Sequence, residues 1–291
     1  MTEAASNFAG VPSRAGGRAG DARVVLLPAP FEGTASYGRG QGAGPGAILA
    51  ASRQVETRDD ETGVDLEELS FALGPEIAVD GRDARAYSAR VEGAVAAVVA
   101  GGKLPFVLGG EHSVTIGAVR AVRERHPGLQ VLSIDAHADL RDRYEGGDHS
   151  HACVGRRVLE GGPFTAVGVR SLSSEEAAFA KSARALRLVS ARDVLSGRVG
   201  PEEIVEALGD PVYLTVDVDG LDPSVVPATG TPEPGGLRWW DVLDLLRTLF
   251  DRRRVVGMDL VELAPVAGSH VSDFAVARLA AKMLIYHGMA G

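Results

Sequence analysis

Short runs of β-branched and other apolar residues alternate along the chain with longer segments in which apolar residues recur at helical spacing. The segment Ala84–Val99 places Tyr87, Val91 and Val95 on one face, as an amphipathic helix does. The runs that read as strands are Val24–Leu27, Leu104–Leu108, Val131–Ile134, Ala166–Val169, Leu186–Val189, Val212–Val218 and Arg254–Met258. Apolar strands separated by helices predict a mostly parallel sheet buried on both faces, in a three-layer α/β/α sandwich.

The beginning of the chain has a different composition from the rest. Residues 1–21 are rich in Ala, Gly and Ser with scattered Arg, and large apolar groups are too few to offset the entropy of ordering. A flexible N-terminal tail is therefore expected over 1–21. Neither a low-complexity linker nor a fixed-period repeat interrupts the remainder, which predicts a single domain over 22–291.

Polar clusters stand at or just after the ends of predicted strands. In open parallel sheets, ligands bind outside the carboxyl ends of the strands, so clusters that are distant in sequence can meet there. Alternate residues of extended backbone point to the same side, which allows Asp135, His137 and Asp139 to converge. The clusters are Gly-Gly-Glu-His-Ser at 109–113, Asp-Ala-His-Ala-Asp at 135–139, Asp-Val-Asp at 217–219 and Glu262 in Val-Glu-Leu.

These clusters favour a site for two metal ions. Each uncompensated buried carboxylate costs several kcal/mol, whereas two divalent cations balance the four aspartates Asp135, Asp139, Asp217 and Asp219. His112 and His137 add neutral ligands. A single Asp-x-Asp or a lone histidine is commonly a cap or a structural residue. The prediction of a metal site therefore rests on the combination of all six residues. Carboxylates with imidazole and no thiolate favour Mn²⁺, and they also admit Zn²⁺, Co²⁺ and Fe²⁺.

The net charge and the cysteine content limit the possible binding partners and the cellular location. A net charge of -9 with a pI near 5.3 argues against nucleic acid and anionic membranes and suits a small cationic substrate. The single cysteine, Cys153, excludes an intrachain disulfide and indicates a reducing compartment, so a cytoplasmic location is expected. Neither a spanning segment nor an apolar signal core is found, so no membrane anchor or export is expected. Cys153 has no evident paired base and is expected to pack.

The sequence resembles the arginase and agmatinase (ureohydrolase) family through Gly-Gly-Glu-His-Ser-Val-Thr, Ser-Ile-Asp-Ala-His-Ala-Asp-Leu and Asp-Val-Asp-Gly-Leu-Asp-Pro. The resemblance extends from Pro-Phe-Glu-Gly-Thr at 30–34 through Ala-Thr-Gly-Thr-Pro at 228–232 to Val-Glu-Leu-Ala-Pro at 261–265. It implies a sheet of about eight strands and a homo-oligomer, either a trimer or a hexamer. It also implies two Mn²⁺ ions, one held by His112, Asp135, Asp139 and Asp217, and the other by Asp135, His137, Asp217 and Asp219.

The reaction implied by this resemblance is hydrolysis of a guanidinium group with release of urea. Two cations would lower the pKa of a water held between them, and Asp139 would orient that water. Glu262 is expected to bind the guanidinium by a charge-assisted hydrogen bond rather than to serve as a surface carboxylate. His151 is expected to protonate the departing amine, with His149 as the close rival. The remaining histidines are expected to be structural or exposed, namely His126, His270 and His287.

The substrate is less constrained than the reaction. Arginases typically bind the α-amino and α-carboxylate groups of arginine with an Asn after the metal motif and an Asp after Gly-Leu-Arg. At these two positions this chain has Arg141 and Ser173. This favours agmatine, which would yield putrescine and urea. Arg141 leaves a carboxylate substrate such as 4-guanidinobutyrate open, and an ion pair with Asp142 or Glu145 is an equally good interpretation. N1-aminopropylagmatine and arginine also stay open as substrates. A catalytically silent metal-binding protein would be a function of another class, although the retained ligands argue against it.

Overall fold

A parallel sheet forms the centre of the molecule in a computed structural model, which describes residues 8–11 and 22–290. The strands of the described residues lie in the order β2-β1-β3-β8-β7-β4-β5-β6, and all neighbouring pairs are parallel. Their bounds are β1 (Val24–Ala29), β2 (Phe71–Leu73), β3 (Leu104–Gly109), β4 (Gln130–Ile134), β5 (Phe164–Val169), β6 (Leu186–Ser190), β7 (Val212–Asp217) and β8 (Val255–Val261).

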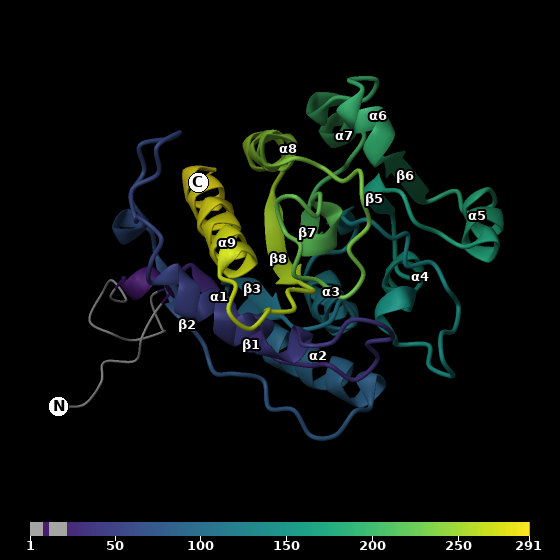
Figure 1. Cartoon of the computed structure of the whole chain (residues 1–291), viewed down its shortest axis with the longest axis horizontal. Coiled ribbons are helices and arrows are strands. Elements are labelled where there is room, and N and C mark those ends of the chain that lie inside the picture. Colours follow the sequence, from purple (N-terminus) through teal and green to yellow (C-terminus); the bar gives the residue numbers. More distant parts are fainter. Residues whose placement is uncertain (1–7, 12–21, 291) are drawn as a thin grey trace.

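Helices cover both faces of this sheet (Figure 1). Alternate strand residues supply two hydrophobic cores, so that Leu26 packs on one face and Val25 on the other. The first face is covered by α1 (Gly44–Ser52), α6 (Ala191–Leu195), α7 (Pro201–Glu206), α8 (Trp239–Arg252) and α9 (Val271–Met289), and the second by α2 (Ala84–Ala100), α3 (Val114–Arg125), α4 (Val154–Leu159) and α5 (Ser174–Ala180). The predicted three-layer α/β/α sandwich is confirmed.

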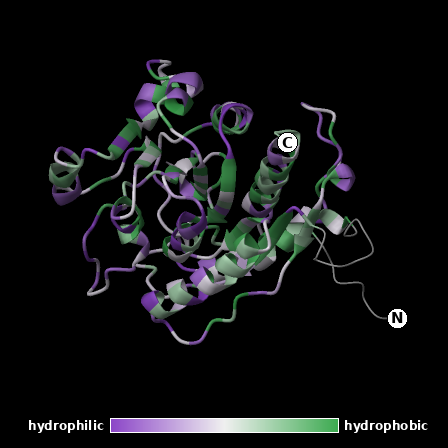
Figure 2. Cartoon of the chain, turned by 180° about the vertical axis from the view of Figure 1, so that it is seen from behind, coloured by the Kyte–Doolittle hydropathy of each residue, from purple (hydrophilic) through white to green (hydrophobic). Residues whose placement is uncertain are grey.

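The central strands are hydrophobic along most of their length (Figure 2). Every residue of β1, β3, β5 and β7 is buried, as expected for parallel strands covered on both faces. Among the described residues, no helix has the length and apolar composition needed to cross a bilayer.

Two strands differ from the sequence prediction by more than two residues at one end or altogether. β2 was not predicted, because its three residues at the sheet edge are too few to show a pattern. β8 continues three residues past the predicted end at Met258. Asp259 interrupts the apolar run in the sequence, but its carboxylate is buried and accepts hydrogen bonds from Tyr213 (2.8 Å) and Thr215 (2.5 Å). A satisfied buried carboxylate can therefore sit within a central strand.

The expected N-terminal tail is only partly covered by the structure, since residues 1–7 and 12–21 lie outside the described residues. Within this segment, Phe8–Val11 pack against the folded domain, which differs from the flexible tail that was expected. Phe8 and Val11 are buried, and the Phe8 ring meets Phe71 edge-on at 6.3 Å between centroids. Averaged composition concealed Phe8, which packs against the edge strand β2, and Val11, which is also buried. The division of the chain at residue 22 stays a prediction.

Candidate functional site

Four adjacent central strands, in the order β3, β8, β7 and β4, direct the predicted site residues to one edge of the sheet. His112 follows β3 after Gly110, at which a Cβ atom would lie only 2.1 Å from the Phe31 carbonyl oxygen. A glycine is therefore required for the chain to pass this point and deliver His112 to the site.

A hydrogen bond from a backbone N–H to a side chain joins the loop after β4 to the loop after β7, and a second one lies within the loop after β7. The Ala136 N–H donates to Asp219 Oδ1 (3.0 Å), and the Asp219 N–H donates to Asp217 Oδ1 (2.9 Å). A Cβ atom on Gly220 would lie 2.8 Å from the Asp135 nitrogen, so glycine allows this close approach. Asp219 lies in a 3-10 turn, Val218–Gly220, instead of the extended strand predicted to reach Val218.

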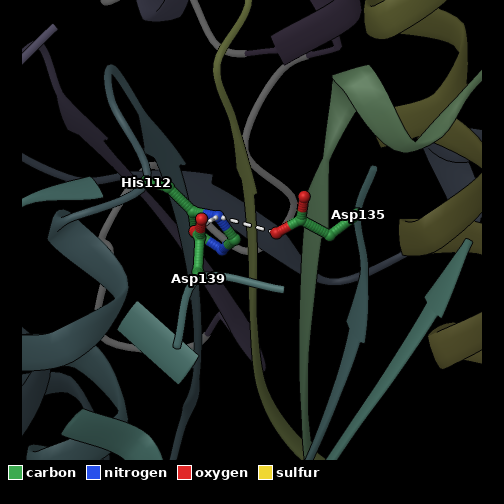
Figure 3. A group of neighbouring side chains, drawn as sticks. All are labelled: His112, Asp135 and Asp139. Carbon is green, nitrogen blue, oxygen red and sulfur yellow. Dashed lines mark ion pairs between the residues drawn. The ribbon is translucent and has the colours of Figure 1, made fainter. Parts of the chain in front are cut away.

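Three carboxylates surround one nitrogen of His112. The Nδ1 atom lies 3.3 Å from Asp135 Oδ2, 3.3 Å from Asp139 Oδ2 and 3.2 Å from Asp217 Oδ2. Figure 3 shows His112 with Asp135 and Asp139, whose carboxylates both point toward the imidazole ring. Asp139 adopts φ 51°, a left-handed conformation that is costly for a residue other than glycine and that is typical of functional sites.

A second group forms around His137 and shares Asp135. His137 Nδ1 lies 2.9 Å from Asp219 Oδ2 and 3.8 Å from Asp135 Oδ1. The two oxygens of Asp135 thus face different histidines. One ligand atom each from His112, Asp135 and Asp139 can be chosen so that all three lie within 4.8 Å of one another, and the same holds for Asp135, His137 and Asp219. The structure brings together all six predicted metal ligands, and Asp135 has the position expected of a bridging carboxylate.

The acidic cluster is electrostatically unfavourable without cations. Burial, together with Asp139 and Asp219, raises the pKa of Asp135 to about 7. Burial and Asp219 also raise the pKa of Asp217 well above its usual range. Burial opposes the charged form of His137, but its hydrogen bond to Asp219 and the nearby carboxylates raise the pKa to about 11. These shifts describe a site that retains protons in the absence of cations, which bound cations would displace.

His112 is oriented by a buried polar chain. Its Nε2 lies 2.9 Å from the Thr215 hydroxyl, which donates to Asp259 Oδ1, while Thr115 donates to Asp259 Oδ2 (2.8 Å). Nδ1 is buried and has no hydrogen-bond partner among the described residues. An orphaned nitrogen facing three carboxylates, with the opposite nitrogen held by a hydrogen bond, is the arrangement of a metal-ligating histidine. The residues therefore fit two divalent cations.

Glu262 lines a cavity of about 310 Å³, which His112, His137, Asp139, Asp217 and Asp219 also line. Its Oε1 accepts a 2.6 Å hydrogen bond from the His112 backbone N–H, and it too has a positive φ, 69°. Burial and the neighbouring Glu111 carboxylate raise the pKa of Glu262 to about 8. Glu262 lies just after β8 and lines the cavity, where a carboxylate can meet a bound cation.

His151 and His149 have different surroundings. His151 lines the cavity, and its Nδ1 lies 3.0 Å from the Thr34 hydroxyl. His149 lines a neighbouring cavity instead, and its Nδ1 lies 2.8 Å from Asp148 Oδ1. The geometry favours His151 as the histidine that can reach a ligand beside the metal residues.

Arg141 lies at the cavity wall, with its guanidinium 5.0 Å from the centroid of the Tyr144 ring. The ion pair expected with Asp142 or Glu145 is not the one observed. Asp142 pairs with Arg157 at 2.7 Å, and the Nε of Arg141 lies 4.0 Å from Glu176 Oε2. Arg141 lies nearest to Glu176 because the capping box of α5 holds this buried carboxylate beside the cavity.

Cys153 and the remaining histidines lie outside the cavity lining. Cys153 is buried, and burial together with Asp139 raises the pKa of its thiol to about 11, which fits the expected packing role. His270 is exposed, whereas His126 and His287 are partly buried at the amino ends of β1, β3 and β8.

Three residues with clear positions near the site were missed from the sequence, namely Glu111, Thr34 and Arg170. Glu111 and Thr34 belong to motifs that carry the family resemblance, but the motifs alone indicate no role for them. Arg170 donates hydrogen bonds to backbone carbonyls of Asp219 (2.7 Å), Gly220 (3.2 Å) and Leu221 (3.2 Å) and so fixes the loop after β7. No residue pattern signals such backbone contacts in advance.

Comparisons with known proteins agree with this geometry. The model of the Arginase family matches residues 22–286. The chain is similar to the N(1)-aminopropylagmatine ureohydrolase of Synechocystis sp., with 41% identity over 282 residues that cover 92% of this chain and 90% of the relative. It is 38% identical to the agmatinase of Pyrococcus horikoshii over 269 residues, 91% of each chain. The structure of the agmatine ureohydrolase of Thermoplasma volcanium matches with a TM-score of 0.86 and 33% identity, covering 97% of this chain and 94% of that one.

Proposed function

The chain belongs to the arginase family, and from this premise we propose that it is a metal-dependent ureohydrolase that cleaves a guanidinium C–N bond and releases urea. The proposal rests on the convergence of two histidines and four aspartates beside Glu262, at a cavity that all of them except the more deeply placed Asp135 line. A random cluster of acidic residues would lack both the orphaned His112 nitrogen and the shared Asp135.

The proposed ligand sets extend the two groups by adding Asp217 to both, as the family resemblance implies. His112, Asp135, Asp139 and Asp217 would hold one cation, and Asp135, His137, Asp217 and Asp219 the other. When bound, the two cations supply the Lewis acidity that generates a strong nucleophile from water at neutral pH. Oxygen and imidazole ligands favour Mn²⁺, which is the metal we propose.

The protein groups bind and orient the substrate. The free Oε2 of Glu262 would accept a charge-assisted hydrogen bond from the guanidinium, because Oε1 is occupied by the His112 N–H. Asp139 would orient the attacking water through a hydrogen bond. His151 would protonate the departing amine, so that it leaves as a neutral group instead of a strongly basic anion.

Agmatine is the proposed substrate, with putrescine as the second product. Its second cation suits a chain with a net charge of -9, and agmatinases are among the relatives. N1-aminopropylagmatine is the second candidate, because relatives at 41% identity carry that name. 4-Guanidinobutyrate is a third, favoured by the position of Arg141 at the cavity wall. We further propose a cytoplasmic homo-oligomer, a trimer or hexamer.

The test is a urea-release assay with Mn²⁺ and a panel of agmatine, N1-aminopropylagmatine, 4-guanidinobutyrate and arginine. The expected result is urea from agmatine, with kcat/KM at least about tenfold above that of arginine, as the loss of specific polar contacts implies. Urea from another member of the panel would correct the substrate. Bound metal without urea from any member would support a catalytically silent metal-binding protein and overturn the proposal.

A further inference from the structure

Glu111 is a fully buried carboxylate to which the proposed reaction assigns no role. Its Oε2 accepts hydrogen bonds from the backbone N–H groups of Gly33 (2.8 Å) and Thr34 (2.7 Å). Its Oε1 accepts from the hydroxyls of Ser113 (2.6 Å) and Thr34 (2.7 Å). The backbone groups can only donate, so Glu111 acts as an acceptor and holds the loop after Phe31 against the start of α3.

The hydroxyl of Thr34 connects this carboxylate to His151. A hydroxyl has one proton to donate and two lone pairs. The proton is directed to Glu111 Oε1, and the lone pairs face the His151 backbone N–H (3.1 Å) and the His151 Nδ1 (3.0 Å). Since no further proton is available from Thr34, Nδ1 must itself carry a proton to complete the second contact.

We propose that Glu111 and Thr34 are positioning residues that hold His151 in the tautomer protonated at Nδ1, so that Nε2 is the nitrogen that exchanges the catalytic proton. The side chain and the backbone of His151 are both anchored to the same hydroxyl, which fixes the ring. Tyr144 further restricts the ring by an edge contact, with the centroids 5.7 Å apart.

The catalytic part of this inference rests on the proposed function. As the water oxygen forms a bond to the guanidinium carbon, the proton that the water releases passes to Nε2 of neutral His151, giving an imidazolium. Nε2–H then donates that proton to the nitrogen of the leaving amine while the C–N bond breaks and its electron pair moves to that nitrogen. His151 returns to the neutral form with its proton on Nδ1, so the step balances without any other reactant.

One competing contact would give the opposite tautomer. The Ser150 hydroxyl lies 3.4 Å from His151 Nδ1 and could donate to it. This contact is longer than that of Thr34, and Ser150 also accepts from the Ala152 N–H (3.3 Å) as the cap of the 3-10 turn His151–Cys153. The variants Thr34→Val and Ser150→Ala therefore separate the two possibilities, and Thr34→Ser keeps the hydroxyl as a matched control.

The first measurement is the tautomer itself, by ¹⁵N solid-state NMR of protein labelled at histidine and loaded with diamagnetic Zn²⁺. The His151 resonances are those missing from His151→Ala. We expect a protonated Nδ1 and an unprotonated Nε2 in the wild-type protein, in Ser150→Ala and in Thr34→Ser, and loss of this single state in Thr34→Val. A proton on Nε2 of neutral His151 in the wild-type protein, or an unchanged tautomer in Thr34→Val, would overturn the proposal.

The second measurement is kinetic, with the substrate that the panel identifies. We expect Thr34→Val to lower kcat about 10- to 100-fold, part of what a general acid contributes, with KM within about twofold. Thr34→Ser should restore kcat to within about threefold, because it keeps the same hydroxyl. A rise in KM with unchanged kcat would contradict the role in positioning. If no substrate yields urea, the proposed function fails while the NMR measurement still decides the tautomer.

Discussion

The backbone N–H of His112 donates a 2.6 Å hydrogen bond to Oε1 of Glu262. The bond joins the carboxyl ends of two adjacent strands, β3 and β8, and a second bond from the Glu262 N–H to the Gly110 carbonyl (2.8 Å) reinforces it. A proposed metal ligand and the proposed guanidinium-binding carboxylate are thus fixed relative to each other by backbone contacts. Such rigidity is what aligns a substrate carbon with a nucleophile.

Glu262→Gln should remove the negative charge of this side chain while keeping its size and its hydrogen bond to His112. The glutamine can still accept the His112 N–H, so metal content should remain within error of the wild-type protein. Loss of a charge-assisted hydrogen bond, worth about 1.5–3 kcal/mol, should lower kcat/KM about 10- to 150-fold. Urea-release kinetics and metal analysis by mass spectrometry check this. Wild-type kcat/KM in Glu262→Gln would show that the guanidinium is bound elsewhere.

The stability of the metal-free protein should fall as pH rises from about 5 to 8. The pKa of Asp135 is raised from 3.8 to about 7 and that of Glu262 from 4.5 to about 8, both chiefly by burial, so the folded state binds more protons than the unfolded state in this range. The raised pKa of His137 has the same sign, because its contribution is lost as pH rises above 6.5 toward about 11.

Metal binding should reverse this trend, because cations displace the protons and stabilise the carboxylates. The measurement is the Tm by calorimetry at pH 5, 6, 7 and 8, with and without Mn²⁺. The difference in Tm between the two forms should widen with pH. A constant difference would mean that these carboxylates neither retain protons nor bind the metal.

His151→Ala should lower kcat about 10²- to 10⁴-fold, the usual contribution of a general acid, without loss of metal. His149→Ala should lower kcat by less than about tenfold, since His149 lines another cavity and is paired with Asp148. Both variants are compared at equal metal content. A larger effect in His149→Ala than in His151→Ala would reassign the proton donor.

The metal ligands were predictable because their residue types and positions at strand ends carry the information. Strand alternation alone does not explain how they meet, however. Extended backbone was expected to align Asp135 with Asp139 and Asp217 with Asp219, whereas Asp139 is left-handed and Asp219 lies in a 3-10 turn. Tertiary contacts, such as Ala136 N–H to Asp219, override the local alternation and still bring the carboxylates together.

Other features could not be read from the sequence for physical reasons. Thr34 meets Glu111 across 77 positions and His151 across 117, and its role depends on the direction of one hydroxyl proton. β2 is too short for periodicity, and the burial of Phe8 depends on the Phe71 ring beside it. In each case the information lies in a pairwise contact and not in the pattern along the chain.

Arg170→Lys should weaken the loop that presents Asp219. Arg170 donates to five backbone carbonyls, those of Gly168, Asp219, Gly220, Leu221 and Glu233, and a lysine ammonium cannot reproduce this planar fork. Affinity for the cation at His137 should fall about 10- to 100-fold, as for other groups that orient ligands. Metal titration checks this. Arg253→Lys is the control, because Arg253 also donates to carbonyls, of Leu208, Arg252 and Glu206, but lies away from the cavity.

Arg141 should determine whether the cavity prefers a cationic or an anionic group at the end of the substrate opposite the guanidinium. Its guanidinium stands near Tyr144 and only loosely beside Glu176, at 4.0 Å, so much of its charge remains available to a ligand. A cationic tail is repelled and a carboxylate tail attracted, and each interaction is worth about 1 kcal/mol at a partly exposed position. Arg141→Ala should therefore lower KM for agmatine about two- to fivefold and raise KM for 4-guanidinobutyrate by a similar factor. Arg143→Ala, which removes an exposed arginine outside the cavity lining, should change neither value. A general loss of packing would change both KM values in the same direction, so it cannot produce opposite changes for the two substrates. A parallel change in both KM values would show that Arg141 does not determine substrate choice.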